Sequence, residues 1–168
     1  MNSHKVFLGL GSNKGNREEY IRSALKKISE LKETSIKKVS SLYETKPYGN
    51  TEQNDFYNLV AEILTRHDIK NLFSELKRIE REVGRIQLDK KWQPREIDID
   101  ILFFNDWIYS DGQIEIPHKD LLNRDFVLVP LIEIDPNFVH PYLGISISEI
   151  DFSSVQKNII CKFPFEYK

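Results

Sequence analysis

The segment KKWQPREIDIDILFF, residues 90–104, alternates apolar and charged positions through its second half. Successive side chains of an extended strand point to opposite faces, so this alternation predicts a strand over about Glu96 to Phe104. The two faces of the predicted strand would carry Ile97, Ile99, Ile101 and Phe103 against Asp98, Asp100, Leu102 and Phe104. Because aspartate is depleted in strands, two aspartates on one face require an explanation.

Five further elements are predicted on the N-terminal side of this strand. They are a buried strand near residues 5–10, a helix from the cap Asn16 to Leu31, strands at 35–45 and 56–65, and a helix from the cap Asp68 to Gly84. The order strand, helix, strand, strand, helix, strand predicts an α+β, ferredoxin-like βαββαβ core, with helices mainly on one face of an antiparallel sheet. The other face would be free to carry a site.

The segment that follows residue 104 adds smaller elements. We expect a hairpin around Asp111-Gly112, a short helix that ends before Asp135-Pro136, and a C-terminal segment that is either a short helix or turn or an extended tail. No internal repeat or linker divides the 168 residues, so we expect a single domain over residues 1–168.

Composition excludes several classes of function. A net charge of -2 provides no field that would attract nucleic acid or an anionic membrane. The chain has no apolar run long enough to span a membrane or to act as a signal peptide, and its single cysteine, Cys161, cannot form an internal disulfide. We therefore expect a cytoplasmic protein, most simply a monomer, without a nucleic-acid or membrane partner.

The two aspartates indicate a candidate metal site. Asp98 and Asp100 would lie on one strand face with their Cα atoms roughly 7 Å apart, so their charges repel each other. A divalent cation relieves this repulsion, and Mg²⁺ typically takes one or two carboxylates together with water and substrate phosphates. From the Asp-x-Asp pattern alone, a solvated strand face remains the more frequent explanation.

Basic residues near the aspartates favour a phosphate site. Arg85, Lys90, Lys91 and Arg95 surround Trp92 in the loop that leads into the strand. Lys and Arg bind phosphate oxygens, and phosphoryl transfer requires cations beside a metal site, although a solvated basic loop is also common.

The later segment PHKDLLNRDF adds His118 and Arg124. His118 is open to two interpretations, as a phosphate contact or as a structural histidine.

At this point the chain resembles a known family. The segments GLGSN, YET, DFYNLV, RIEREVGR, WQPREIDIDILFF and IPHKDLLNRDFVLVPLIEIDP occur in order over roughly residues 5–142. They look like those of 6-hydroxymethyl-7,8-dihydropterin pyrophosphokinase, an enzyme of folate biosynthesis. The resemblance implies a ferredoxin-like fold and transfer of pyrophosphate from ATP to the pterin hydroxymethyl group, with AMP and the pterin diphosphate as products.

The resemblance also implies roles for residues at the nucleotide side. Asp98 and Asp100 would hold two Mg²⁺ ions that bridge the ATP phosphates, and Arg85 and Arg95 would be catalytic with them. The implied ATP-binding set is Glu80, Lys91, Trp92, His118 and Arg124.

A second implied set binds the pterin. Phe56 and Phe126 would sandwich the ring, Asn58 would hydrogen-bond its edge, and Thr45 would contact it through its hydroxyl or backbone. Phe56 and Asn58 are two apart on a predicted strand, so they share a face, and a flat polar heterocycle needs such a stacking surface beside a directed donor and acceptor. Without the resemblance, Phe56 and Phe126 would be interpreted as core residues.

The chain departs from the family pattern at four positions. Gln87 stands where a second loop arginine is frequent, Phe56 replaces the usual tyrosine, and Lys46 and Tyr48 replace a more apolar pattern. The grip on ATP would then depend more on Lys90 or Lys91.

Two other classes of function compete with this interpretation. One is a non-catalytic ferredoxin-like binding module, which leaves the paired aspartates unexplained. The other is a metal-dependent nuclease that uses Asp98, Asp100 and Glu80, which the net charge of -2 disfavours.

Overall fold

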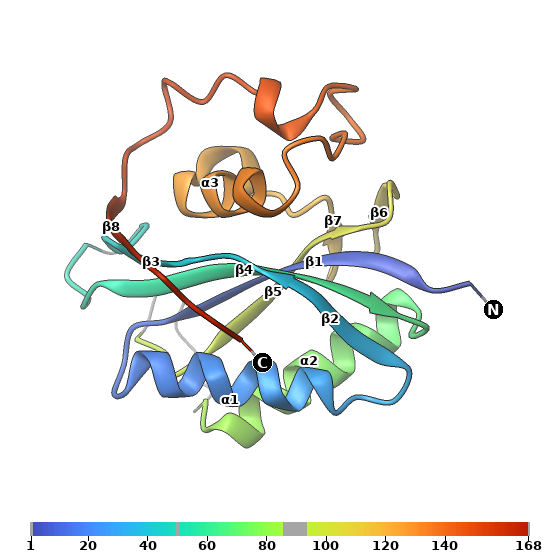
Figure 1. Cartoon of the computed structure of the whole chain (residues 1–168), viewed down its shortest axis with the longest axis horizontal. Coiled ribbons are helices and arrows are strands. Elements are labelled where there is room, and N and C mark those ends of the chain that lie inside the picture. Colours follow the sequence, from blue (N-terminus) through green and yellow to red (C-terminus); the bar gives the residue numbers. More distant parts are fainter. Residues whose placement is uncertain (1, 50, 86–93, 168) are drawn as a thin grey trace.

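The computed structural model describes residues 2–49, 51–85 and 94–167, and its centre is a six-stranded antiparallel sheet (Figure 1). The strands are β1 (His4–Ser12), β2 (Thr34–Val39), β3 (Leu42–Thr45), β4 (Phe56–Thr65), β5 (Asp98–Phe104) and β8 (Ile159–Phe163). The order across the sheet is β5-β1-β4-β3-β8, and β2 also pairs with β4. The predicted ferredoxin-like arrangement is therefore confirmed, with β8 as an added edge strand.

Two long helices, α1 (Arg17–Ser29) and α2 (Ile69–Val83), cover one face of the sheet (Figure 1). Both begin at the predicted caps: the side chains of Asn16 and Asp68 accept hydrogen bonds from the backbone N–H groups of Glu19 and Asn71. Gly84 ends α2 with a φ of 123°, a conformation that side-chain-bearing residues rarely adopt.

The opposite face is partly covered, and not free as the sequence led us to expect. The helix α3 (Asp125–Ile134) packs there with the C-terminal segment that carries the 3-10 helix η2 (Ile147–Glu149) (Figure 1). A second hydrophobic core forms under them, around Phe7, Phe103 and Leu128. The hairpin β6 (Tyr109–Ser110) and β7 (Glu115–Ile116) and the 3-10 helix η1 (Leu121–Asn123) precede α3. On this face, site residues therefore come from the part that α3 leaves open.

The strand β5 carries a β-bulge that the alternation did not predict. Ile101 is paired with Leu8 and Phe103 with Phe7, so Leu102 is an extra residue in the ladder. The aspartates keep their predicted common face, but the two phenylalanines after the bulge exchange sides. Phe103 packs in the core under α3, and Phe104 packs in the core under α1 and α2.

The predicted strand at 35–45 is also interrupted. It forms β2 and β3, which both pair with β4 and are separated by Ser40 and Ser41. Ser40 exchanges two hydrogen bonds with the backbone of Val60, one through its own N–H and one through its hydroxyl. The bond from the Ser40 hydroxyl takes the place of a regular ladder pair between the strands.

Within the described residues, no helix has both the length and the apolar character needed to cross a membrane.

Candidate active site

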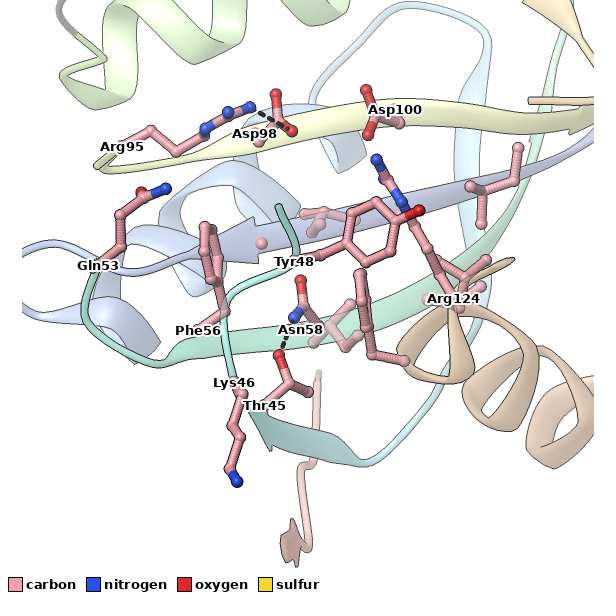
Figure 2. A pocket seen from close by; sticks show the side chains of 18 residues that line it. Thr45, Lys46, Tyr48, Gln53, Phe56, Asn58, Arg95, Asp98, Asp100 and Arg124 are labelled. Carbon is pink, nitrogen blue, oxygen red and sulfur yellow. Dashed lines mark hydrogen bonds and ion pairs between the residues drawn. The ribbon is translucent and has the colours of Figure 1, made fainter. Parts of the chain in front are cut away.

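The floor of the candidate site is a pair of glycines in β1. Gly11 lies opposite Asp98 and Gly9 lies opposite Asp100 in the ladder between β1 and β5. On the other side of β1, Gly11 pairs with Asn58 of β4. Because neither glycine carries a side chain, the space between the carboxylates of β5 and Asn58 of β4 stays open (Figure 2).

Asp98 is held by two arginines. Its carboxylate lies 2.9 Å from Nη1 of Arg95 and 2.8 Å from Nη1 of Arg85. Burial alone would raise the pKa of Asp98, but the positive charges of Arg95, Lys77 and Arg85 outweigh it and lower the pKa. The ionised form of Asp98 is therefore favoured, and its oxygens face the two arginines.

Asp100 differs from Asp98 in its surroundings. Nε2 of His118 lies 3.9 Å from its Oδ2. Partial removal from water raises the pKa of Asp100, and the negative charge of Asp98 raises it further. A divalent cation would relieve this unfavourable negative charge.

The backbone orients His118 toward Asp100. The His118 N–H donates to the carbonyl of Leu102, the bulged residue of β5, at 3.0 Å. Nδ1 of His118 accepts from the N–H of Asp120 at 3.2 Å, so a neutral ring carries its proton on Nε2, which faces Asp100. The bulged residue Leu102 thus supplies the carbonyl that holds the backbone of His118 beside Asp100.

Glu80 of α2 anchors the outer side of this cluster. Its Oε1 accepts from the N–H of Ile99 at 2.7 Å and from Lys77 at 3.0 Å, and its Oε2 accepts from Arg85 at 2.8 Å. Its side chain is 4% exposed, and burial is the main reason that its pKa is raised. Glu80 therefore fixes Arg85 and the start of β5 from below the sheet.

The far side of the pocket is aromatic and amide-lined. Phe56 and Asn58 of β4 face it together with Thr45 of β3 and Phe126 of α3 (Figure 2). Nδ2 of Asn58 donates to Oγ1 of Thr45 at 2.8 Å, which fixes the amide and directs its Oδ1 toward Gly11. A flat heterocycle with a polar edge fits such a lining.

Tyr48 and Arg124 close the pocket between these two sides. The Arg124 guanidinium lies 5.0 Å from the centre of the Tyr48 ring and 5.8 Å from that of Phe126. Asp120 accepts from Nη2 of Arg124 at 3.2 Å. Figure 2 shows the Arg124 head group pointing toward Asp100.

A second hollow adjoins the first at Asp100. It lies between α2 and the β6–β7 hairpin, and its lining includes Phe73, Ile99, Asp100, Gln113, His118 and Lys119. Asp100 is a lining residue of both hollows. A carboxylate between two hollows is suited to a reaction that joins two substrates.

The family model described as 7,8-dihydro-6-hydroxymethylpterin-pyrophosphokinase (HPPK) matches residues 7–136. The chain belongs to this family. A pyrophosphokinase of Aquifex aeolicus, named for 2-amino-4-hydroxy-6-hydroxymethyldihydropteridine, is 40% identical over 156 residues, which are 93% of this chain and 96% of that protein. A protein of the same name from Haemophilus influenzae is 42% identical over 136 residues, with 81% and 84% covered.

Other HPPK relatives are longer proteins. The chain is 39% identical to the folic acid synthesis protein fol1 of Pneumocystis carinii but spans only 22% of its length. A solved structure of Plasmodium falciparum HPPK-DHPS superimposes with a TM-score of 0.65 at 21% identity, covering 88% of this chain and 41% of that one. At this identity the match supports the fold alone.

These comparisons confirm the predicted class of enzyme, an ATP-dependent pyrophosphokinase of folate biosynthesis, as well as the resemblance from which it came. HPPK enzymes are kinases, a class that generally requires Mg²⁺.

The structure brings together most of the residues predicted for the HPPK site. The first hollow is lined by Thr45, Phe56, Asn58, Arg95, Asp98, Asp100, Arg124 and Phe126, and the second by Asp100 and His118. Glu80 and Arg85 lie beside Asp98 in the ion-pair cluster. The predicted ATP contacts Lys91 and Trp92, with Gln87 and Lys90, lie outside the described residues.

Sequence reasoning missed three contributors. Gly9 and Gly11 form the floor, and Lys77 joins the ion-pair cluster through Glu80. The signal for the glycines was present, since alternate glycines inside a strand often mark close approach of a ligand or another backbone.

Proposed function

We propose that the chain transfers the pyrophosphoryl group of ATP to the hydroxymethyl oxygen of 6-hydroxymethyl-7,8-dihydropterin, using the residues of these two hollows. The observation that carries the proposal is the position of Asp100, which lines both hollows beside Asp98. The first hollow suits the pterin, and the second suits the nucleotide. The group to be transferred would then pass the two carboxylates.

In the first hollow, Phe56 and Phe126 would stack on the pterin ring. Asn58, held by Thr45, would hydrogen-bond the ring edge, since its amide offers both a donor and an acceptor. The glycine floor would allow the ring to approach the backbone of β1.

Asp98 and Asp100 would hold Mg²⁺, and we expect two ions. Among the described residues, no group of three or more His, Cys, Asp and Glu side chains could hold a metal ion by itself. Two carboxylates fit Mg²⁺, which commonly completes its shell with water and substrate phosphates. Burial and the negative charge of Asp98 raise the pKa of Asp100, and a bound cation would oppose both effects. The metal supplies charge neutralisation on the phosphate oxygens when it is bound.

Cationic side chains would hold the remaining phosphate oxygens. Arg95 lies beside Asp98, His118 lies beside Asp100, and Arg124 lines the same hollow. Glu80 would position Arg85 for the same task. Lys91 and Trp92 remain predicted ATP contacts. Such groups act mainly by orienting the reactants and by stabilising charge that develops in the transition state.

The bond changes follow from this arrangement. The pterin hydroxymethyl oxygen bonds to the β-phosphorus, the bond from that phosphorus to the oxygen bridging to the α-phosphate breaks, and AMP leaves with the bridging oxygen. The hydroxyl proton is released to solvent or to a phosphate oxygen. We expect the segments 46–54 and 85–92, of which residues 50 and 86–92 lie outside the described part of the chain, to exclude water from this step.

The test is AMP formation from ATP and Mg²⁺, with and without the pterin. We expect pterin-dependent AMP from the wild type, and loss of at least about a hundredfold in kcat for Asp98→Ala with the fold intact. Asp106→Ala removes an exposed carboxylate in the turn after β5 and is the matched control.

Other products would contradict the proposal. ADP in place of AMP would identify an ordinary kinase, and the absence of any nucleotide product would favour a binding module. Full activity in Asp98→Ala would remove the assigned role of the carboxylates.

The remaining expectations stay predictions. The chain would act as a single pyrophosphokinase domain over residues 1–168, as a cytoplasmic monomer without a nucleic-acid or membrane partner. Sedimentation of the purified chain tests the oligomeric state directly.

A further inference from the structure

The segment after residue 136 lies outside the family match but inside the fold. The match ends at residue 136, whereas β8 pairs with β3 and thereby extends the central sheet. In Figure 1 this segment runs from above α3, past the edge of the sheet at β3, to the face covered by α1. At its end, the hydroxyl of Tyr167 donates to the carbonyl of Leu25 in α1.

A buried carboxylate fastens this segment to α3. Oδ2 of Asp125, the first residue of α3, accepts from the N–H of Asn158 at 2.8 Å and from the N–H of Ile159 at 3.0 Å. Asp125 is 6% exposed and Asn158 is 1% exposed. Two backbone N–H groups that are removed from water thus depend on this one oxygen for their hydrogen bonds.

The same residue, Asn158, is bonded to the other wall of the pocket. Its carbonyl accepts from the N–H of Lys46 at 2.9 Å, and the next residue, Ile159, pairs with Thr45. The backbone at Asn158 thus joins the wall that carries Arg124 and Phe126 to the wall that carries Thr45.

The position of Asp125 in the chain makes this connection relevant to the pocket. Asp125 stands between Arg124 and Phe126, which both line the hollow assigned to the pterin. Its carboxylate points away from the hollow, toward the C-terminal segment, so its effect on the site is indirect. A shift of α3 relative to β3 would change the distance from Phe126 to Thr45 and to the Asn58 amide that Thr45 holds.

We propose that Asp125 is a positioning residue for the pterin, and that through Asn158 the C-terminal segment sets the spacing between the two walls of the pterin pocket. This inference rests on the proposed function. The nucleotide hollow, between α2 and the β6–β7 hairpin, has no lining residue from this connection among the described residues. Arg124, the expected phosphate contact beside Asp125, is also held by Asp120, so the effect should be larger on the pterin than on ATP.

The test compares three substitutions by steady-state formation of AMP. Asp125→Ala removes the acceptor, Asp125→Glu keeps it but lengthens the side chain, and Asp125→Asn keeps an oxygen at the original reach. We expect the KM for the pterin to rise about tenfold or more in the Ala and Glu variants, with the KM for ATP changed less than about twofold. Asp125→Asn should restore most of the pterin affinity.

The control is Asp151→Ala, which removes an exposed aspartate of the same C-terminal segment whose carboxylate accepts from the N–H of Ser153. A purely structural role of Asp125 would lower the melting temperature and the active fraction without raising the KM for the pterin. If Asp125→Ala does not fold, Asp125→Glu decides, because it retains a carboxylate for both N–H groups.

The outcomes separate the two proposals. If the wild type is active and Asp125→Ala and Asp125→Glu keep its KM for the pterin, the positioning role alone is overturned. An equal rise in the KM for the pterin and the KM for ATP would overturn it as well. A wild type that forms no pterin-dependent AMP overturns the proposed function, and this inference with it.

Discussion

At the scale of single residues, the absence of a side chain at Gly11 is as important as the side chains around it. A Cβ placed on Gly11 would lie 2.5 Å from Oδ1 of Asn58, far inside van der Waals contact. Asn58 would have to turn, which would break its hydrogen bond to Thr45. We expect Gly11→Ala to weaken pterin binding at least about tenfold, or roughly 1.4 kcal/mol, as measured by the KM for the pterin.

Gly9 provides the matched control two positions earlier in the same strand. The three atoms nearest to a Cβ placed there belong to the Leu102 side chain, and the closest lies at 3.5 Å, which is an ordinary contact. Gly9→Ala should therefore change the KM for the pterin less than Gly11→Ala. Equal effects of the two substitutions would show that lost space on the floor, and not the displaced amide, is responsible.

The face of the sheet on which a side chain lies could be predicted from the sequence where it depends only on the alternation within one strand. The common face of Asp98 and Asp100 follows from alternation, and the structure confirms it. The exchange of Phe103 and Phe104 depends on the bulge at Leu102, which arises from pairing with β1, far away in the chain. Alternation within one strand contains no information on that pairing.

At the scale of elements, Glu133 connects α3 to the interrupted edge of the sheet. Its carboxylate accepts from the backbone and hydroxyl of Ser41 at 2.9 and 2.7 Å, and from the hydroxyl of Tyr43 at 2.5 Å. Burial would raise the pKa of Glu133, but these hydrogen bonds outweigh it and lower the pKa. The folded protein therefore favours the ionised form.

This contact predicts a pH-dependent loss of stability. Because the pKa of Glu133 is lower in the folded than in the unfolded chain, its stabilisation is complete above the unfolded pKa and is lost as the pH falls through the folded one. Glu133→Gln should lower the free energy of unfolding by about 1 kcal/mol near pH 7, a modest value because the side chain is exposed. Denaturant titrations should show this difference shrinking below about pH 4.

A double-mutant cycle with Tyr43→Phe isolates the contact. The double variant should lose less stability than the sum of the two single variants, because Glu133 and Tyr43 bond to each other. Strict additivity, or a difference that is constant with pH, would contradict the role assigned to this hydrogen bond.

Elements were predictable where their signals are local. The caps Asn16, Asp68 and Gly84 mark helix ends that the structure confirms, because capping needs only a few neighbouring residues. The strand β8 could not be separated from a turn or a loose tail, since it exists through pairing with β3 and through the buried Asp125 contact. The break between β2 and β3 likewise depends on the distant Val60.

At the scale of the whole molecule, the order of elements was sufficient for the sheet but not for its second covered face. The βαββαβ order leads directly to the observed strand order β5-β1-β4-β3. Apolar residues of β1 and β5, such as Phe7 and Leu102, point to the opposite face of the sheet. Because these side chains must be removed from water, α3 and the C-terminal segment cover part of that face. The pocket is therefore the remaining open part of a largely covered face.

The residues of the two hollows come from several strands and helices of the fold. A ligand that binds them only in the folded protein should therefore stabilise the whole fold. At a concentration of about 100 times its Kd, Mg·ATP or a non-hydrolysable analogue should add about 2.7 kcal/mol to the free energy of unfolding. For a chain of this size, the melting temperature should rise roughly 5–11 °C. The pterin should raise it further in the presence of the analogue.

Removal of the metal tests the role of the carboxylates at the same scale. With EDTA in excess, the shift caused by the analogue should largely disappear, because the negative charges of Asp98, Asp100 and the phosphates would then face each other without a cation. Asp98→Ala should lose most of the shift even with Mg²⁺, whereas Asp106→Ala should keep it. An undiminished shift in EDTA would mean that the arginines around Asp98 hold the phosphates without metal, and that the two aspartates serve only to orient Arg85, Arg95 and His118.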